Sequence, residues 1–463
     1  MGSLRSVRPG LRQRASRVAL CLWGLALLMG CGGGSLSSAL GGSSTPQPTG
    51  EQANTLLTGT FVDSPVEGLA YVTSSGLSGV TDAQGRFRFQ AGDTITFRIA
   101  GVDIGTAPAA TTLTPASLAG GDEDSARFSN LLVLLQSLDT DGDPSNGIRL
   151  SPELPADQVR DIVALLDQDP FDFGDGAYNV GLQSLATDGY IRPLEDAARH
   201  YENAMGLLDP FLGDAAGVWQ ATGADGTAYV FRLSTSGRYV LASAQASSPS
   251  ASGLMLGTLA RGPQGQWAVR DIKLDTRSVP APSSLQVGET LGLQFVRGEQ
   301  GAAQDQLMLS RTMGSLSLMF QRATQSADLA GAWSTTPELK PGGVMLLFGE
   351  PDAQTGQGQI TVVDPQGESE GRGEVGTSCE LASQFFPGVE RGLFVLQGSE
   401  LSFLQPTVDT NGCAGIHDGQ TPIGPLLYNV SPDGNTLDLV LPSLEGSGQD
   451  SKTQRLYRIQ RQP

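Results

Sequence analysis

Apolar and polar residues alternate along several short segments between residues 54 and 120. The segments are LLTGTFVD (56–63), GLAYVTS (68–74), RFRFQ (86–90) and TITFRIAG (94–101). Because side chains of a strand alternate between its two faces, each segment predicts a half-buried β-strand. Ile95, Phe97 and Ile99 then share one face, and DAQG (82–85) predicts a turn with Gly85 at positive φ. We expect a small β-sandwich over residues 54–120.

The next part of the chain, residues 121–210, has the three- and four-residue apolar spacing of helices. It is clearest in ARFSNLLVLLQSL (126–138), PADQVRDIVALLDQ (155–168) and RPLEDAARHYENAMGLL (192–208). Ser125 is a suitable N-cap for the first of these helices. DPFDFGDGAYNVG (169–181) is predicted as a loop from its composition. We expect a short helical connector.

From residue 211 onward the chain repeats itself. DAAGVW (214–219) recurs as DLAGAW (328–333) after 114 residues, and KLDT (273–276) is echoed by TVDT (407–410). Both copies close with alternating segments typical of strands. We therefore predict two tandem antiparallel β-barrel or β-sandwich domains, over 211–325 and 326–463. The fold class is mainly β and multi-domain.

Two resemblances to known families follow from these motifs. PVEGLAYV (65–72) followed by GVTDAQGRFRF (79–89) resembles the carboxypeptidase-regulatory-like, transthyretin-like β-sandwich, which implies a stalk or spacer. The Gly-x-Trp that opens each repeat, ending at Trp219 and Trp333, resembles the opening of a lipocalin-type barrel, in which the tryptophan closes one end. The alternative is a tryptophan packed in the core of a small barrel or sandwich.

The first 30 residues are typical of an export signal. Five arginines precede the apolar run VALCLWGLALLMG (18–30), which is short for a membrane-spanning helix. LMGC (28–31) resembles the lipobox of bacterial lipoproteins, which implies lipidation of Cys31 and removal of residues 1–30. Gly32 resembles the family's outer-membrane sorting pattern. The alternative is a plain secretory signal, and residues 31–53 are predicted as a flexible tether.

The net charge of the chain limits the classes of binding partner that we expect. The chain carries a net charge of −19, and removing a signal that holds five arginines and no acid leaves −24. Such an acidic protein is not expected to bind nucleic acid or an anionic membrane surface directly. We expect the lipid to provide the attachment to the outer membrane, with the folded part facing the periplasm or the cell surface.

The folded part holds two cysteines, Cys379 and Cys413. In an exported protein such a pair most simply forms a disulfide, and the alternative is two buried free thiols.

An acidic loop follows the first predicted helix. Asp139, Asp141, Asp143 and Ser145 stand at positions 1, 3, 5 and 7 of a loop similar to that of an EF-hand, which predicts a structural calcium site. Two departures count against the full motif: Pro144 replaces the glycine at position 6, and Leu150 replaces the glutamate at position 12. The alternative is a series of Asx turns that end the helix, with Gly147 at positive φ.

Sequence signatures of enzymes are mostly absent. The chain has neither H-E-x-x-H nor G-x-S-x-G, and its two histidines, His200 and His417, restrict general-base chemistry. GRGEVG (371–376) matches G-x-G-x-x-G but lacks the β-α-β setting of a dinucleotide site.

We therefore expect no enzyme, but a lipid-anchored envelope protein with a non-catalytic binding, adhesion or scaffolding role. Tyr428, Phe385 and Phe386 are candidate contact residues. The alternatives are a glycan-directed hydrolase that uses two carboxylates and a lipocalin-like carrier of a small apolar ligand.

Overall fold

The computed structural model describes most of the chain between residues 55 and 459. The residues that it does not describe are 1–54, 169–176, 263, 279–283, 299–303, 313–315, 325, 327, 338–341, 368–385, 413–415, 419–420, 423–424, 442–450 and 460–463. Residues 53–463 form one compact unit. Among the described residues no helix has both the length and the apolar character needed to cross a membrane.

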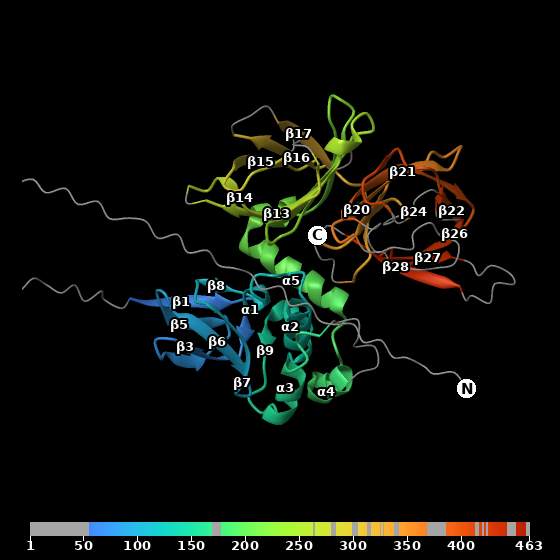
Figure 1. Cartoon of the computed structure of the whole chain (residues 1–463). Helices are drawn as coiled ribbons and strands as arrows, with labels where there is room; N and C mark the ends of the chain where they lie inside the picture. Colours follow the sequence, from blue (N-terminus) through green and yellow to red (C-terminus); the bar gives the residue numbers. More distant parts are fainter. Residues whose placement is uncertain are drawn as a thin grey trace, which may run out of the picture. The chain divides into compact units, whose positions relative to one another are not determined.

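Small sheets open the described chain (Figure 1). One has three strands in the order β5-β1-β8, one has four in the order β4-β3-β6-β7, and β2 pairs with β9. Their bounds are β1 (Leu56–Phe61), β2 (Val66–Glu67), β3 (Ala70–Thr73), β4 (Ser78–Val80), β5 (Arg86–Gln90), β6 (Thr94–Ile99), β7 (Val102–Pro108), β8 (Thr112–Leu113) and β9 (Ile148–Arg149). Ile95, Phe97 and Ile99 are all buried, as the alternation predicts. Gly85 has a φ of 68° in a turn where Asp82 accepts from the amides of Gln84 and Arg86.

Helices follow and share one hydrophobic core with the sheets. They are α1 (Pro115–Leu118), α2 (Ala126–Ser137), α3 (Ala156–Val163), α4 (Ala177–Leu185), α5 (Leu194–Leu208) and α6 (Pro210–Ala215), with short 3₁₀ turns at Pro144–Asn146, Thr187–Gly189 and Pro249–Ala251. Ser125 caps α2 through a hydrogen bond from the Phe128 amide, as expected. The core extends from Phe61 in β1 to Met205 in α5, so these two segments are packed together.

One local prediction was wrong. Residues 177–181, assigned to a loop from their composition, begin α4. Gly181 lies where α4 meets α3, and a Cβ on it would stand 2.6 Å from the Cδ1 of Ile162. The absence of a side chain at Gly181 therefore leaves room for the Ile162 side chain between the two helices.

The first repeat is a closed antiparallel barrel in which eight strands follow one another around the ring (Figure 1). The strands are β10 (Gly217–Thr222), β11 (Ala228–Leu233), β12 (Arg238–Ala244), β13 (Gly253–Arg261), β14 (Trp267–Asp275), β15 (Thr290–Val296), β16 (Gln306–Arg311) and β17 (Ser317–Arg322). Pairing of β17 with β10 closes it, with Trp219 opposite Arg322.

The second repeat closes in the same way. Its eight ring strands are β18 (Gly331–Ser334), β19 (Met345–Phe348), β20 (Gln357–Asp364), β21 (Gly388–Gln397), β22 (Glu400–Phe403), β26 (Leu426–Val430), β27 (Thr436–Leu441) and β28 (Lys452–Arg458), with β23 (Val408–Asp409) also on β21 and a separate pair β24 (His417–Asp418) and β25 (Thr421–Pro422). Pairing of β20 with β21 completes the ring, and Trp333 lies opposite Arg458. Both repeats are thus barrels rather than sandwiches.

The tryptophan of each repeat is held identically. Each indole is fully buried and donates to a carbonyl four residues earlier, Trp219 to Ala215 and Trp333 to Leu329, both at 2.8 Å. An arginine of the last strand covers each ring, with the guanidinium carbon of Arg322 4.1 Å from the Trp219 ring centroid. The corresponding distance between Arg458 and Trp333 is 3.9 Å. The motif therefore packs the tryptophan under a cation at the point where each barrel closes.

The two barrels also share an apolar cluster. Alternate residues of the first barrel, among them Val230 and Val240, face away from its interior and are buried against residues of the second barrel such as Leu347 and Val389. This explains why β11 and β12 are buried along their whole length rather than on one face.

Candidate functional site

A cavity of about 590 Å³ lies beside the first barrel, where α5 and α6 lead into β10. Its lining comes from α5, α6, β10, β11, the β11–β12 turn and two further residues, Arg297 and Ile459. We call it the α5–β11 cavity. Its volume is within the range of small-molecule sites.

Two glycines allow the helices that line this cavity to approach each other. A Cβ on Gly213 would lie 2.6 Å from the carbonyl oxygen of Gly206, and one on Gly206 would lie 3.1 Å from the Cα of Gly213. Both positions line the cavity. Backbone contact between α5 and α6 therefore shapes this wall.

A buried cation and an acid with a shifted pKa face the cavity. Arg232 is only 4% exposed, and burial lowers its pKa to about 10, so its guanidinium remains charged at neutral pH. Burial raises the pKa of Glu202 from 4.5 to about 7, against the lowering effect of Arg232, while Glu123 raises it further. Near neutral pH, Glu202 is therefore only partly ionised, while Arg232, whose charge is favoured by Glu202 and Asp124, stays protonated.

Two further arginines of the lining, Arg297 and Arg199, lie close to carboxylates. Arg297 forms an ion pair with Asp214. Arg199 lies 3.6 Å from Asp196, and its Nε is buried without a hydrogen-bond partner. The cavity thus contains more positive than negative charge, while Leu207, Leu233 and other lining residues are apolar.

A chain of polar contacts holds α5 and the β11–β12 turn in place. Glu123, buried between them, accepts from Tyr201 of α5 at 3.2 Å and from Ser236 of the turn at 2.7 Å. Ser236 is within 2.8 Å of Ser234, which lines the cavity. Burial raises the pKa of Glu123.

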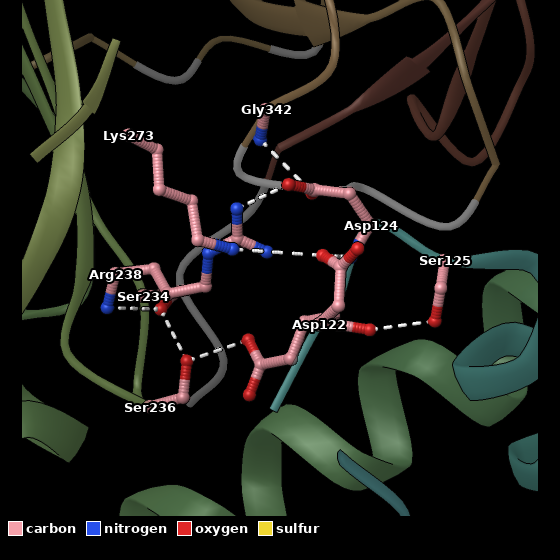
Figure 2. A network of polar contacts seen from close by, with 9 residues as sticks. Asp122, Asp124, Ser125, Ser234, Ser236, Arg238, Lys273 and Gly342 are labelled. Carbon is pink, nitrogen blue, oxygen red and sulfur yellow. Dashed lines mark hydrogen bonds and ion pairs between the residues drawn. The ribbon is translucent and has the colours of Figure 1, made fainter. Parts of the chain in front are cut away.

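The same segment reaches both barrels (Figure 2). Asp124 pairs with Arg238 of β12 and accepts from the amide of Gly342, which precedes β19, at 3.3 Å. Lys273 of β14 lies 3.6 Å from Asp122. These contacts tie the loop 122–125 to the first barrel and to the segment before β19.

No family model matches the chain. No curated protein and no solved structure is significantly similar to it either. Function must therefore be inferred from the geometry of the sites themselves.

The acidic loop that predicts a calcium site is held by its own backbone. Asp141 accepts from the amide of Asp143 at 3.0 Å, and Asp143 from the amide of Ser145 at 3.1 Å, as in Asx turns. Asp139 is buried, accepts from the amide of Arg149, and has a second carboxylate oxygen without a hydrogen-bond partner. Gly147 has a φ of 112°, as the alternative interpretation requires.

Burial, together with the charge of Asp141, raises the pKa of Asp139, whereas hydrogen bonds from Asp143 and Asn146 lower that of Asp141. In the described part of the chain, no three acidic, histidine or cysteine side chains are grouped to hold a metal ion. Calcium would have to displace these turns, so the site stays a prediction of weak affinity.

We expect calcium to raise the melting temperature only in the millimolar range, because carboxylates must first leave their backbone donors. Asp141→Ala should abolish the shift, and Glu153→Ala, outside the loop, should not. Calorimetry that detects no heat up to millimolar calcium would leave the loop as a helix-ending turn.

Some of the other predicted site residues are described by the structure, and some are not. Cys31, Cys379, Cys413, Phe385 and the segment 371–376 lie outside the described residues. His200 contacts the Ser64 hydroxyl and the Asp63 carbonyl, each at 3.0 Å, in a structural role within the first core. Phe386 is exposed, and Tyr428 lies against the carbonyl of Gly398.

Sequence reasoning missed Glu202 and Arg232. Glu202 occurs in a helix with many charged residues and Arg232 in an alternating strand, and neither has a neighbouring motif. Only the packing of α5 beside β11 brings them together.

Proposed function

We propose that this protein is a non-catalytic binding protein of the cell envelope that takes up a small organic anion in the α5–β11 cavity. The observation that carries the proposal is the buried Arg232 guanidinium in the wall of a cavity of about 590 Å³ that also has apolar lining. A few convergent polar groups in a largely apolar concavity are the usual design of a ligand site.

The charge of the ligand follows from the cavity. Arg232 is charged at neutral pH, and Glu202, with a pKa of about 7, is half neutral there. A carboxylate, sulfonate or phosphate would form charge-assisted hydrogen bonds with the arginines of this lining. An apolar body would contact Leu207 and Leu233.

The hydrolase alternative is less well supported. A glycosidase needs two carboxyl groups about 5–10 Å apart with separate acid and base roles. The acids of this cavity are Glu202 and Asp214, and Asp214 is engaged by Arg297. An acid held in an ion pair is poorly suited to accept a proton.

The carrier alternative requires a hollow barrel. The closed eight-stranded rings support the lipocalin-type resemblance of the Gly-x-Trp motif at the level of architecture. However, the interior behind Trp219 contains Phe231, Tyr239 and Phe320, with ring centroids of Phe231 and Phe320 5.6 Å apart. A packed interior favours a structural role for the barrel and places ligand binding outside it.

The predicted signal and tether suggest the cellular location at which the protein binds its ligand. Lipidation of Cys31 would anchor the chain at the outer membrane, and the small sheets, which resemble a transthyretin-like spacer, would separate the barrels from the bilayer. Support for this location comes from the sequence pattern of residues 1–53.

The test uses the aromatic anion 8-anilinonaphthalene-1-sulfonate, whose fluorescence rises in apolar surroundings, with the compact unit Ala53–Pro463. We expect a single saturable site, and at least tenfold weaker binding in Arg232→Met because the sulfonate loses its cation. Arg270→Met, which removes an exposed arginine from β14, is the matched control and should bind normally.

The pH dependence gives an independent readout. As pH rises from 6 to 8, Glu202 ionises and repels the anion, so affinity of the native chain should fall. Glu202→Gln should bind equally at both values. Unchanged binding by Arg232→Met would refute the cavity as the site.

A further inference from the structure

The strand registers of the two barrels place their residues in one-to-one correspondence. Trp219 and Trp333 occupy equivalent positions in the two barrels. Following the residues that lie opposite each other from these tryptophans across the next two strands leads to Leu241 in the first barrel and to Val362 in the second. Leu241 lies opposite Met255, whereas Val362 lies opposite Glu390. A methionine of the first barrel interior therefore corresponds to an ionisable glutamate in the second.

The surrounding backbone is the same in both barrels. The Thr276 hydroxyl accepts from the amide of Leu254 at 3.0 Å, and the Thr410 hydroxyl accepts from that of Val389 at 2.8 Å. Met255 pairs with Asp275, as Glu390 pairs with Asp409. The repeated Leu-Asp-Thr and Val-Asp-Thr sequences thus end in superimposable geometry.

The residue after this threonine differs in a way that changes the charge. In the first barrel it is Arg277, whose side chain is 1% exposed and which donates from Nε and Nη2 to Asp275 at 2.8 and 3.0 Å. In the second barrel it is Asn411. The amides of both residues donate to the preceding aspartate at 3.2 Å, so the two backbones coincide here. Compared with the first barrel, the second barrel therefore lacks the guanidinium of Arg277 and has the additional carboxyl group of Glu390.

Both substituted residues of the second barrel have unsatisfied polar atoms. Glu390 and Asn411 are each 0% exposed. Glu390 accepts from the Ile416 amide at 2.9 Å through one oxygen, and its other oxygen has no hydrogen-bond partner. The amide oxygen and nitrogen of Asn411 both lack partners. Polar atoms buried without a hydrogen-bond partner are energetically costly, which makes a bound partner favourable.

We propose that the second barrel binds a guanidinium group of a small ligand at Glu390 and Asn411, in the place that Arg277 fills from within the first barrel. The carboxylate of Glu390 and the amide oxygen of Asn411 would accept hydrogen bonds from the N–H groups of the planar guanidinium. Asp409, which lies opposite Glu390 on the paired strand, provides a second carboxylate nearby. The Asn411 amide nitrogen is left to donate to an acceptor elsewhere on the ligand.

L-Arginine and L-citrulline test the proposal as a matched pair, because citrulline keeps the shape and replaces the guanidinium with a neutral urea. We expect arginine to give a saturable heat in calorimetry and to raise the melting temperature of the Ala53–Pro463 unit, and citrulline to do neither. Equal binding of both compounds, or no binding of arginine, would overturn the proposal.

Two variants copy the first barrel. Glu390→Met should weaken arginine binding at least tenfold, and Asn411→Arg should abolish it because the side chain occupies the site. Glu400→Gln, an exposed acid on β22, is the control. If Asn411→Arg fails to fold, Glu390→Met alone decides the outcome: unchanged arginine binding in it would rule the site out. Arg232→Met should leave arginine binding intact, which separates this site from the α5–β11 cavity.

Discussion

Glu390→Gln should remove a loss of stability that the native protein suffers between about pH 5 and pH 8. Burial raises the pKa of Glu390 from 4.5 to about 8, and the carboxylate of Asp409 raises it further, against the hydrogen bond from the Ile416 amide. In that pH window the folded state binds a proton that the unfolded state has released, so stability falls as pH rises. The full loss is roughly 5 kcal/mol.

The measurement is urea denaturation of the native chain and the variant, free of added ligand, at several pH values. Glu202 and Glu123 also have raised pKa values, so only the difference between the two stability curves isolates Glu390. Glu400→Gln should give the native curve. A variant curve parallel to the native one from pH 5 to 8 would show that Glu390 is already ionised in the folded state.

Trp333→Ala should destabilise the protein by about 3–5 kcal/mol. The indole is fully buried, donates to the Leu329 carbonyl and is covered by Arg458, which itself donates to the carbonyls of Ala330 and Asp328. Removing the ring leaves a large cavity at the strand pair that closes the barrel. It also removes the aromatic surface against which the buried Arg458 guanidinium packs. Trp219→Ala in the first barrel should cost a similar amount, because its contacts are the same.

Denaturation followed by tyrosine fluorescence and by circular dichroism measures this cost. Trp333→Phe, which keeps an aromatic ring under the arginine and loses only the hydrogen bond and part of the volume, should cost clearly less. A loss below 1 kcal/mol in Trp333→Ala would show that the closure motif contributes little to stability.

Much of the fold could be predicted from local patterns. The alternation in 86–90 and 94–99 identified strands whose apolar faces are buried, and the recurrence of DAAGVW as DLAGAW identified two tandem β-domains. These signals depend on neighbouring residues and on internal repetition, both of which a single sequence contains. The choice between barrel and sandwich required the pairing of β17 with β10 and of β20 with β21, which no local pattern specifies.

The candidate sites were harder to predict. Glu202 and Arg232 belong to elements with different periodicities and meet only through the packing of α5 beside β11. The Glu390 site had a partial signal, since the echo of KLDT in TVDT aligns Arg277 with Asn411. The match of Glu390 with Met255, however, needs the register of strands far apart in the sequence. The acidic loop, by contrast, was conspicuous in sequence, yet its carboxylates are largely engaged by their own backbone.

A crystal structure of the Ala53–Pro463 unit with bound 8-anilinonaphthalene-1-sulfonate would show whether the α5–β11 cavity is the anion site. We expect density for the sulfonate within hydrogen-bond distance of the Arg232 guanidinium, with the rings against Leu207 and Leu233. Density for the molecule inside a barrel or on an exposed face, with the cavity beside Arg232 empty, would contradict this expectation.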